Sequence, residues 1–332
     1  MVEGNAVRPG SGQVRWSPGR SLWCGLITAV ALVGAIPAFT VPAFGVFAVG
    51  TALTLCAGHS VGIHRGIIHR AYRVPRWLEY TLTYLGVLVG LGGPRGLVRM
   101  HNTRDFQQNQ PGCHDYFAHR QPAWRDYFWN LHCRFEFDEP FEPCVDERVE
   151  ADAFHGFLER TWMWQQVPWA VLLFAVGGLP WLVWGGFMRV TVSITGHWLV
   201  GYLAHRYGEQ EWFNEGAAVQ GYNLLWLGAL SMGEGWHNNH HTYPRSARLG
   251  FRRWEFDAGW GLLVLLRTLG LATHLLLPGE ATRAPQARLS EARASRPARS
   301  RNSRRASGPG TGADGRPSRR ARRAGRLLGT GC

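Results

Sequence analysis

The stretch Gly233-Glu234-Gly235-Trp236-His237-Asn238-Asn239-His240-His241 decides how this sequence is interpreted. Three histidines stand in it at relative positions 0, 3 and 4, so a helical turn places all three on one face. Neutral imidazole is the commonest metal ligand in proteins. The motif alone is equally compatible with two solvated histidines and a third that makes an ordinary hydrogen bond. The other segments of the chain therefore have to show whether the cluster binds a metal.

Charge is concentrated at the C-terminal end of the chain. All 36 basic residues are arginine, and residues 281–332 hold 14 of them against Glu291 and Asp314, which accounts for about +12 of the formal net charge of +13. The remaining 280 residues are close to neutral, so the basic composition predicts no nucleic-acid-binding fold. Both ends are rich in Gly, Pro and Arg without periodicity. We expect residues 1–20 and 280–332 to be disordered and cytosolic.

Two apolar blocks predict the membrane part of the chain. Residues 21–58 contain no charged side chain, and these 38 residues exceed the roughly 20 that one span requires. Pro37 and Pro42 divide this block, and a turn at Gly177-Gly178-Leu179-Pro180 divides the second block. The predicted spans cover about 21–38, 42–58, 162–178 and 181–204.

Four spans in two hairpins place both termini on the same side, and the arginines at both ends indicate the cytoplasmic side. The apolar stretch 80–94 is too short for a span and predicts an interfacial or re-entrant helix. Arg189, in the fourth span, is expected to extend toward the far membrane face. The predicted fold class is an all-α integral membrane protein: residues 21–279 form four transmembrane helices and a cytosolic helical cap that carries a histidine-rich metal centre.

The histidines gather at one membrane face of this topology. Four separate segments that end or begin at the cytoplasmic side contribute His59, His64, His69, His101, His205, His237, His240 and His241. His59 is left out of the predicted site, because five residues of α-helix turn it about 140° away from His64. A centre at the boundary of hydrocarbon and water suits O₂-dependent attack on an acyl chain better than hydrolysis of a soluble substrate, and iron is the preferred metal for that chemistry.

Three motifs resemble those of membrane fatty-acid desaturases of the stearoyl-CoA desaturase type. The stretch His64-Arg65-Gly66-Ile67-Ile68-His69-Arg70 resembles their HRxxxHR box, and Gly233–His241 resembles their third box, GEGxHNxHH. The stretch Trp198-Leu199-Val200-Gly201-Tyr202-Leu203-Ala204-His205 is similar to the family's segment that ends in an additional histidine ligand. The resemblance covers about residues 21–278 and agrees in order and spacing.

This resemblance implies two iron ions held by about nine histidines at the cytosolic ends of the spans. It also implies O₂ as the oxidant and an acyl-CoA or acyl-lipid as the substrate, in which a cis double bond is introduced. The chain shows no haem-binding pattern and no four-cysteine cluster, so we expect an external electron donor, either a ferredoxin or a cytochrome with its reductase. The expected ligands are His64, His69, His101, Asp105, His205, His237, His240 and His241.

The second histidine box departs from the family pattern HxxHH. This chain has His101-Asn102-Thr103-Arg104-Asp105, and Gly201 stands where the family often has an asparagine. Three interpretations remain open. In the first, Asp105 supplies an oxygen ligand in place of histidine. In the second, the guanidinium of Arg104, which cannot lose its proton, weakens one metal site and leaves one iron, with hydroxylation as the reaction. In the third, the centre is degenerate and the protein only binds lipid.

Two further expectations concern the neighbourhood of this box. Arg104 could point away from the metals and pair with Asp126 or with Asp105. Cys113-His114 and His119 follow soon afterwards in the sequence. A replacement ligand from this segment is conceivable, but we expect it to be a surface loop.

Overall fold

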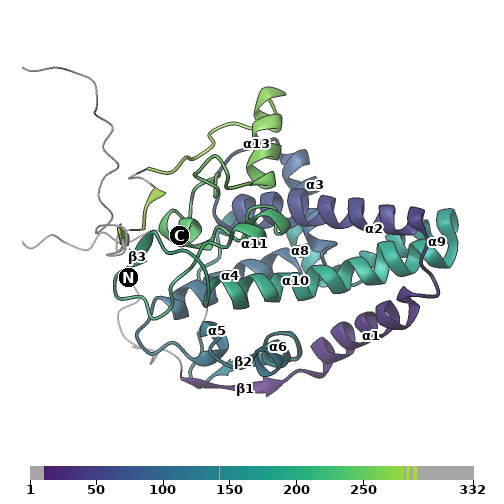
Figure 1. The fold of residues 1–332 in the computed structure, drawn as a ribbon, viewed down its shortest axis with the longest axis horizontal. Coiled ribbons are helices and arrows are strands. Elements are labelled where there is room, and N and C mark those ends of the chain that lie inside the picture. The colour runs from purple at the N-terminus through teal and green to yellow at the C-terminus, as the bar shows by residue number, and fades with distance from the viewer. Residues whose placement is uncertain (1–10, 142, 280–281, 285–286, 290–332) are drawn as a thin grey trace, which may run out of the picture.

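The computed structural model describes residues 11–141, 143–279, 282–284 and 287–289. Long helical segments lie beside one another, and shorter elements gather at one end of them as a cap (Figure 1). The long segments are α1 (Pro18–Ala35), α2 (Val41–Leu53) with the π-helix η1 (Thr54–Ile68), and α9 (Gln166–Trp181) with η2 (Leu182–Met188) and α10 (Arg189–Ala204).

Three segments are long and apolar enough to cross a membrane, whereas the sequence predicts four spans. They cover Pro18–Ala35, Val41–Ile68 and Gln166–Ala204. The third contains a break, because Gly178 has the non-helical angles φ 62° and ψ −156°. A Cβ atom on Gly185 would lie 3.2 Å from the side chain of Leu173, so the parts on either side of the break pack against each other.

The apolar stretch around residues 80–94 forms α3 (Arg76–Val87) and the turn that leads into α4 (Pro94–Gln108). Helix α3 packs closely on η1, because a Cβ atom on Gly58 would lie 2.4 Å from the backbone of α3. The buried guanidinium of Arg189 donates hydrogen bonds to the carbonyls of Leu88 (2.6 Å) and Gly185 (2.9 Å). The prediction that Arg189 extends toward the far membrane face is therefore wrong: the free carbonyl after α3 is a nearer partner.

The cap contains strands as well as helices, so the prediction of an all-α protein is wrong in this respect. Its helices are α5 (Asp115–Ala118), α6 (Ala123–His132), α7 (Glu147–Glu150), α8 (Ala153–Thr161), α11 (Leu225–Leu230), α12 (His237–Thr242) and α13 (Ala258–Thr268). Two antiparallel ribbons pair β1 (Gly12–Trp16) with β2 (Cys133–Phe137) and β3 (Trp212–Asn214) with β4 (Ala287–Leu289).

Both ribbons include residues that the sequence predicts to be disordered. Strand β1 is ordered by backbone pairing with β2 and by a salt bridge between Arg15 and Glu136 at 2.7 Å. These partners are more than 110 residues away in the sequence, so local composition did not reveal them. Residues 1–10 and 290–332, the remainder of the predicted tails, lie outside the described residues.

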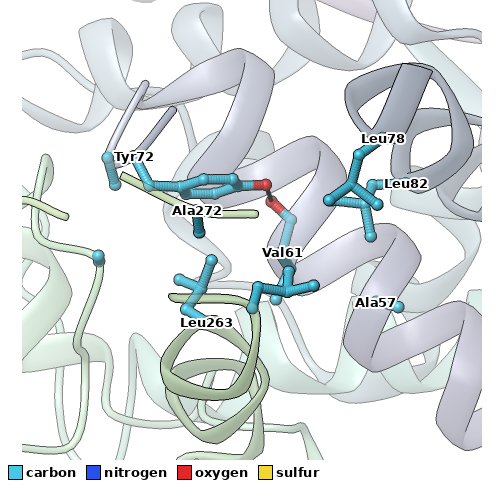
Figure 2. Packing of buried hydrophobic residues seen from close by; sticks show 10 residues of the cluster. Ala57, Val61, Tyr72, Leu78, Leu82, Leu263 and Ala272 are labelled. Atoms are coloured by element: carbon cyan, nitrogen blue, oxygen red, sulfur yellow. Dashed lines mark hydrogen bonds between the residues drawn. The ribbon is translucent and has the colours of Figure 1, made fainter. Parts of the chain in front are cut away.

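An apolar cluster joins the C-terminal part of η1 to α3 and α13 (Figure 2). Val61 and Leu263 are fully buried in it, and the Tyr72 hydroxyl donates a hydrogen bond to the carbonyl of Val61 at 3.0 Å. A fully buried aliphatic side chain contributes roughly 1.5–3 kcal/mol. This packing therefore fixes the end of η1, which carries two of the predicted ligands, against the cap.

Candidate metal centre

The structure brings seven of the predicted histidines into two groups. The first consists of His64, His69, His101 and His240, and the second of His205, His237 and His241. Within each group the candidate ligand atoms lie within 4.8 Å of one another. Helix α12 contributes to both groups, since its three histidines follow the 0, 3, 4 spacing: His237 and His241 belong to one group and His240 to the other.

The distances within the groups fit metal ligation. In the first group Nε2 of His64 lies 3.3 Å from Nε2 of His240 and 3.2 Å from Nε2 of His69. In the second, Nε2 of His205 lies 3.1 Å from Nε2 of His237. Two nitrogens bonded to one metal at roughly 2.1 Å, with roughly 90–110° between them, are separated by roughly 3.0–3.4 Å. The imidazoles therefore already stand at the spacing that one ion per group requires.

Hydrogen-bond partners on the opposite ring nitrogens direct the Nε2 lone pairs into the groups. Nδ1 of His64 lies 2.6 Å from the carboxylate of Glu234, which also accepts a hydrogen bond from the Ser60 hydroxyl. Nδ1 of His205 donates to the carbonyl of Gln220 at 3.2 Å. A carboxylate or carbonyl behind the ring fixes the tautomer of a metal-bound histidine and raises its basicity.

Burial disfavours the charged form of the three histidines of α12. Burial, followed by the neighbouring His241, lowers the pKa of His237 to about 3. Burial, followed by His101, lowers the pKa of His241 to about 4. Burial also holds the pKa of His240 well below its ordinary value. Metal ligation requires the deprotonated imidazole, so this donor set fits a metal ion such as iron.

Two buried asparagines hold α12 in place. Asn238 accepts hydrogen bonds from the backbone of Glu211 and Trp212 and donates to the carbonyls of Trp212 and Gly221, all at 2.8–2.9 Å. The Asn239 amide donates to the carbonyl of Leu249 at 2.8 Å. The asparagines of the opening motif thus position the histidines on either side of them.

The altered second box lies on α4 and contributes only His101 to the groups. Asp105 is in neither group; its carboxylate lies 3.4 Å from Nδ1 of His101. Arg104 points toward the cap, where it donates hydrogen bonds to Nε2 of His119 and to the Asn130 side chain. The pairing of Arg104 with Asp126 that the sequence suggests is therefore indirect, because His119 lies between them and bonds Asp126 at 2.8 Å.

The expectation of a surface loop around residues 113–119 is wrong. Cys113 and His119 are buried at 5% and 2% exposure. The ring of His119 is nearly parallel to that of His205, with centroids 5.8 Å apart. The segment is buried because its aromatic residues pack on β2, which sequence spacing alone does not indicate.

His59, which the sequence analysis leaves out of the ligand set, belongs to neither histidine group. The geometric reason given for its exclusion assumed an α-helix, but η1 is a π-helix, in which residues five apart are joined by hydrogen bonds and lie nearly above one another. His59, His64 and His69 therefore share a face. The ring of His59 lies 4.8 Å from that of His197 on α10, and both histidines line the cavity described next.

A cavity of about 750 Å³ lies between the long helices and the cap. This volume is within the range of roughly 300–1,000 Å³ that is typical of ligand sites. Its walls combine apolar side chains with six of the seven grouped histidines: His64, His101, His205, His237, His240 and His241. The apolar lining includes Trp23, Phe47, Leu55, Trp162, Leu227 and Leu230.

The fold and the site define a helical protein with candidate membrane spans and paired histidine groups that face one apolar cavity. The model of the fatty acid desaturase family matches residues 37–262. The chain belongs to this family, whose members are oxidoreductases.

Curated relatives cover most of the chain. The sn-1 stearoyl-lipid 9-desaturase of Synechocystis sp. is 34% identical over 270 residues, which span 79% of this chain and 80% of the relative. The sn-2 palmitoyl-lipid 9-desaturase of Nostoc sp. is 33% identical over 66% of this chain and 76% of its own length. The acyl-CoA 5-desaturase of Anemone leveillei is 33% identical over 67% of this chain and 68% of its own length. These relatives support a fatty acyl desaturase and do not favour the hydroxylase or the non-catalytic alternative.

Proposed function

We propose that this protein introduces a cis double bond into a fatty acyl chain, with O₂ as the oxidant and iron as the metal. The observation that carries the proposal is the cavity in which apolar side chains and both histidine groups meet. An acyl chain of a lipid or a CoA ester is the substrate class that an apolar cavity of this size between candidate spans suits. The acyl-lipid and acyl-CoA desaturases among the relatives support the same class.

In this proposal the protein holds the iron ions, positions the acyl chain and excludes bulk water. The four histidines of the first group and the three of the second would hold one iron ion each. Bound iron would supply the activation of O₂ and the removal of hydrogen from an unactivated methylene. The cavity walls would align the methylenes beside both groups and keep bulk water from them, so that catalysis depends on positioning rather than on a general base.

Asp105 remains a candidate eighth ligand. It follows His101 by one helical turn on α4, and its carboxylate faces Nδ1 of His101. Its side chain is 36% exposed, so it has room to turn toward the groups. The variant Asp105→Asn distinguishes a carboxylate that binds the ion from one that only orients His101.

We also propose four spans in two hairpins with both termini in the cytoplasm. The break at Gly178 and the packing of Leu173 against Gly185 favour a reversal of the chain within Gln166–Ala204. Such a reversal would bring His205, at the end of α10, to the same membrane face as His64 and His69 at the end of η1. Electrons would then come from a separate cytosolic donor, a ferredoxin or a cytochrome with its reductase.

Expression of the full chain in a host strain that cannot make unsaturated acyl chains tests the function. We expect new cis-unsaturated acyl chains by gas chromatography with mass spectrometry, and none from a matched His240→Ala variant. Hydroxylated products instead would overturn desaturation in favour of hydroxylation. If the protein is expressed with bound iron and a reducing partner but leaves the acyl chains unchanged, the chain is a non-catalytic lipid-binding protein.

A further inference from the structure

A buried chain of hydrogen bonds joins Arg104 to a carboxylate through a histidine. The Arg104 guanidinium donates to Nε2 of His119, and Nδ1 of His119 donates to Asp126 at 2.8 Å. Because an arginine nitrogen only donates, Nε2 of His119 must be the accepting nitrogen and Nδ1 must carry the proton. Burial, and then the charge of Arg104, lowers the pKa of His119 to about 4, in agreement with a neutral ring between a cation and an anion.

Asp126 is a buried carboxyl group that accepts hydrogen bonds from several side chains. It is 0% exposed, and its Oδ1 also accepts hydrogen bonds from Trp198 Nε1 (2.8 Å) and from the Asn130 amide (3.1 Å). Asn130 in turn accepts a hydrogen bond from Arg104 at 2.8 Å. Oδ1 of this buried carboxyl group thus accepts hydrogen bonds from three side chains, and two of them, His119 and Asn130, link it to the Arg104 guanidinium.

The same histidine lies against the second metal group. Its ring stacks on that of His205 at an interplanar angle of 12°, with centroids 5.8 Å apart. The space for it exists because residue 201 is glycine: a Cβ atom there would lie 3.1 Å from Nε2 of His119. Two departures from the family pattern, Arg104 and Gly201, therefore meet at His119.

We propose that His119 and Asp126 hold the Arg104 guanidinium away from the second histidine group, so that this group can bind a metal ion beside a fixed positive charge. The inference rests on the proposed metal binding of the two groups. His119 is in this account a positioning residue: it contacts the ligand His205 and restrains Arg104, and it does not itself ligate. Without His119, Arg104 would keep only its hydrogen bond to Asn130, and its cation would be less restrained from approaching His205, His237 and His241, where it would oppose a metal dication.

Metal content of the purified full chain tests the proposal without any need for turnover. The chain and its variants are reconstituted anaerobically with Fe²⁺ and analysed for metal per chain. We expect His119→Ala to bind one ion fewer than the unaltered protein and Arg104→Gln to bind the same number. The double variant, with both substitutions, is expected to regain the ion, because the cation that opposes it is gone.

Two results would overturn the inference. Full metal content in His119→Ala would show that Arg104 needs no restraint. A double variant that stays as depleted as His119→Ala would show that His119 ligates the ion or supports the fold. The unfolding midpoint of the metal-free variants separates those two cases, since ligand loss leaves it unchanged.

Failure of the proposed function gives a different pattern. If the unaltered protein binds iron and the variants follow the expected order but no desaturated product forms, the positioning role stands and desaturation fails. If the unaltered protein binds no iron, both proposals fall.

Discussion

The two histidine groups differ in how many segments build them and in what lies behind them. The first draws His64 and His69 from η1, His101 from α4 and His240 from α12, with Glu234 and Ser60 behind His64. The second draws His205 from the end of α10 and two histidines from α12, with a backbone carbonyl behind His205. Helix α4 provides His101 to the first group, and its Arg104 donates a hydrogen bond to His119, whose ring is stacked on that of His205 in the second group.

The two histidine groups therefore share one element and differ in the others. Helix α12 presents ligands to both groups from one turn, so both halves share a scaffold that the asparagines between its histidines fix. Helix α4 provides His101 to the first group, and its Arg104 reaches the second group only through His119. The restraint of Arg104 by His119 therefore concerns the second group and leaves the ligand set of the first in place.

Removal of one ligand from each group is expected to have the largest effect on product formation and to reveal the difference between the groups. We expect both His240→Ala and His241→Ala to lower product formation by more than ~100-fold, since the loss of an outer partner alone costs roughly 10–100-fold. Their metal content should differ. His241→Ala leaves two imidazoles and should lose its ion, whereas His240→Ala leaves three in the first group and should retain a weakly bound ion.

Iron titration of the two variants by calorimetry measures this difference. The matched control is His274→Ala, since His274 is exposed and belongs to neither group. Equal metal loss in the two ligand variants would contradict the asymmetry between the groups.

Glu234→Gln is expected to lower the iron affinity of the first group alone, and so to separate the two groups. The carboxylate that faces Nδ1 of His64 at 2.6 Å becomes a neutral amide, which reduces the basicity of the ring. We expect the iron affinity of the first group to fall by roughly 10–100-fold, with the second group unaffected. Glu209→Gln, a change at a side chain 80% exposed, is the control. An equal loss in both groups would show that Glu234 acts on the whole cap.

The sequence was sufficient for the parts of the site that depend on local spacing. Six of the seven grouped histidines lie in the three matching motifs and His101 in the altered second box, because helical periodicity and box spacing are local properties. The place of His59 beside the cavity was not foreseen, because a π-helix leaves no clear mark in the sequence and its five-residue register differs from that of an α-helix. His119 and Asp126 were missed as site residues because only long-range packing brings their segment to the second group.

The fold shows the same limit. The apolar blocks predicted the long helices, but the ribbon of β1 and β2 depends on a partner far away in the chain. The partner of Arg189 was not foreseen, because the carbonyl that it bonds belongs to a turn after α3 that the sequence did not locate beside it.

Asn238→Ala tests the scaffold that supports the second group. The side chain satisfies four backbone groups of the segment that carries Gln220, the hydrogen-bond acceptor of His205. Each buried group left without a partner costs roughly 1–3 kcal/mol, so we expect the free energy of unfolding to fall by about 2–5 kcal/mol. Chemical unfolding of the metal-free chain in detergent measures it, with the exposed Asn109→Ala as control. A change below about 1 kcal/mol would mean that the loop keeps its place without Asn238.

The smallest effect on iron affinity is expected for a change at Asp105. This change tests whether Asp105 is a ligand of the first group. From 3.4 Å its carboxylate orients Nδ1 of His101 only weakly, and the side chain is partly exposed. Asp105→Asn should therefore lower the iron affinity of the first group by less than ~10-fold, below the range for a close outer partner. Asp115→Asn, on an exposed carboxylate outside both groups, is the control. A loss as large as that of His240→Ala would instead identify Asp105 as a ligand, because only a donor bonded to the ion has so large an effect, and the first group would then hold five donors against three in the second.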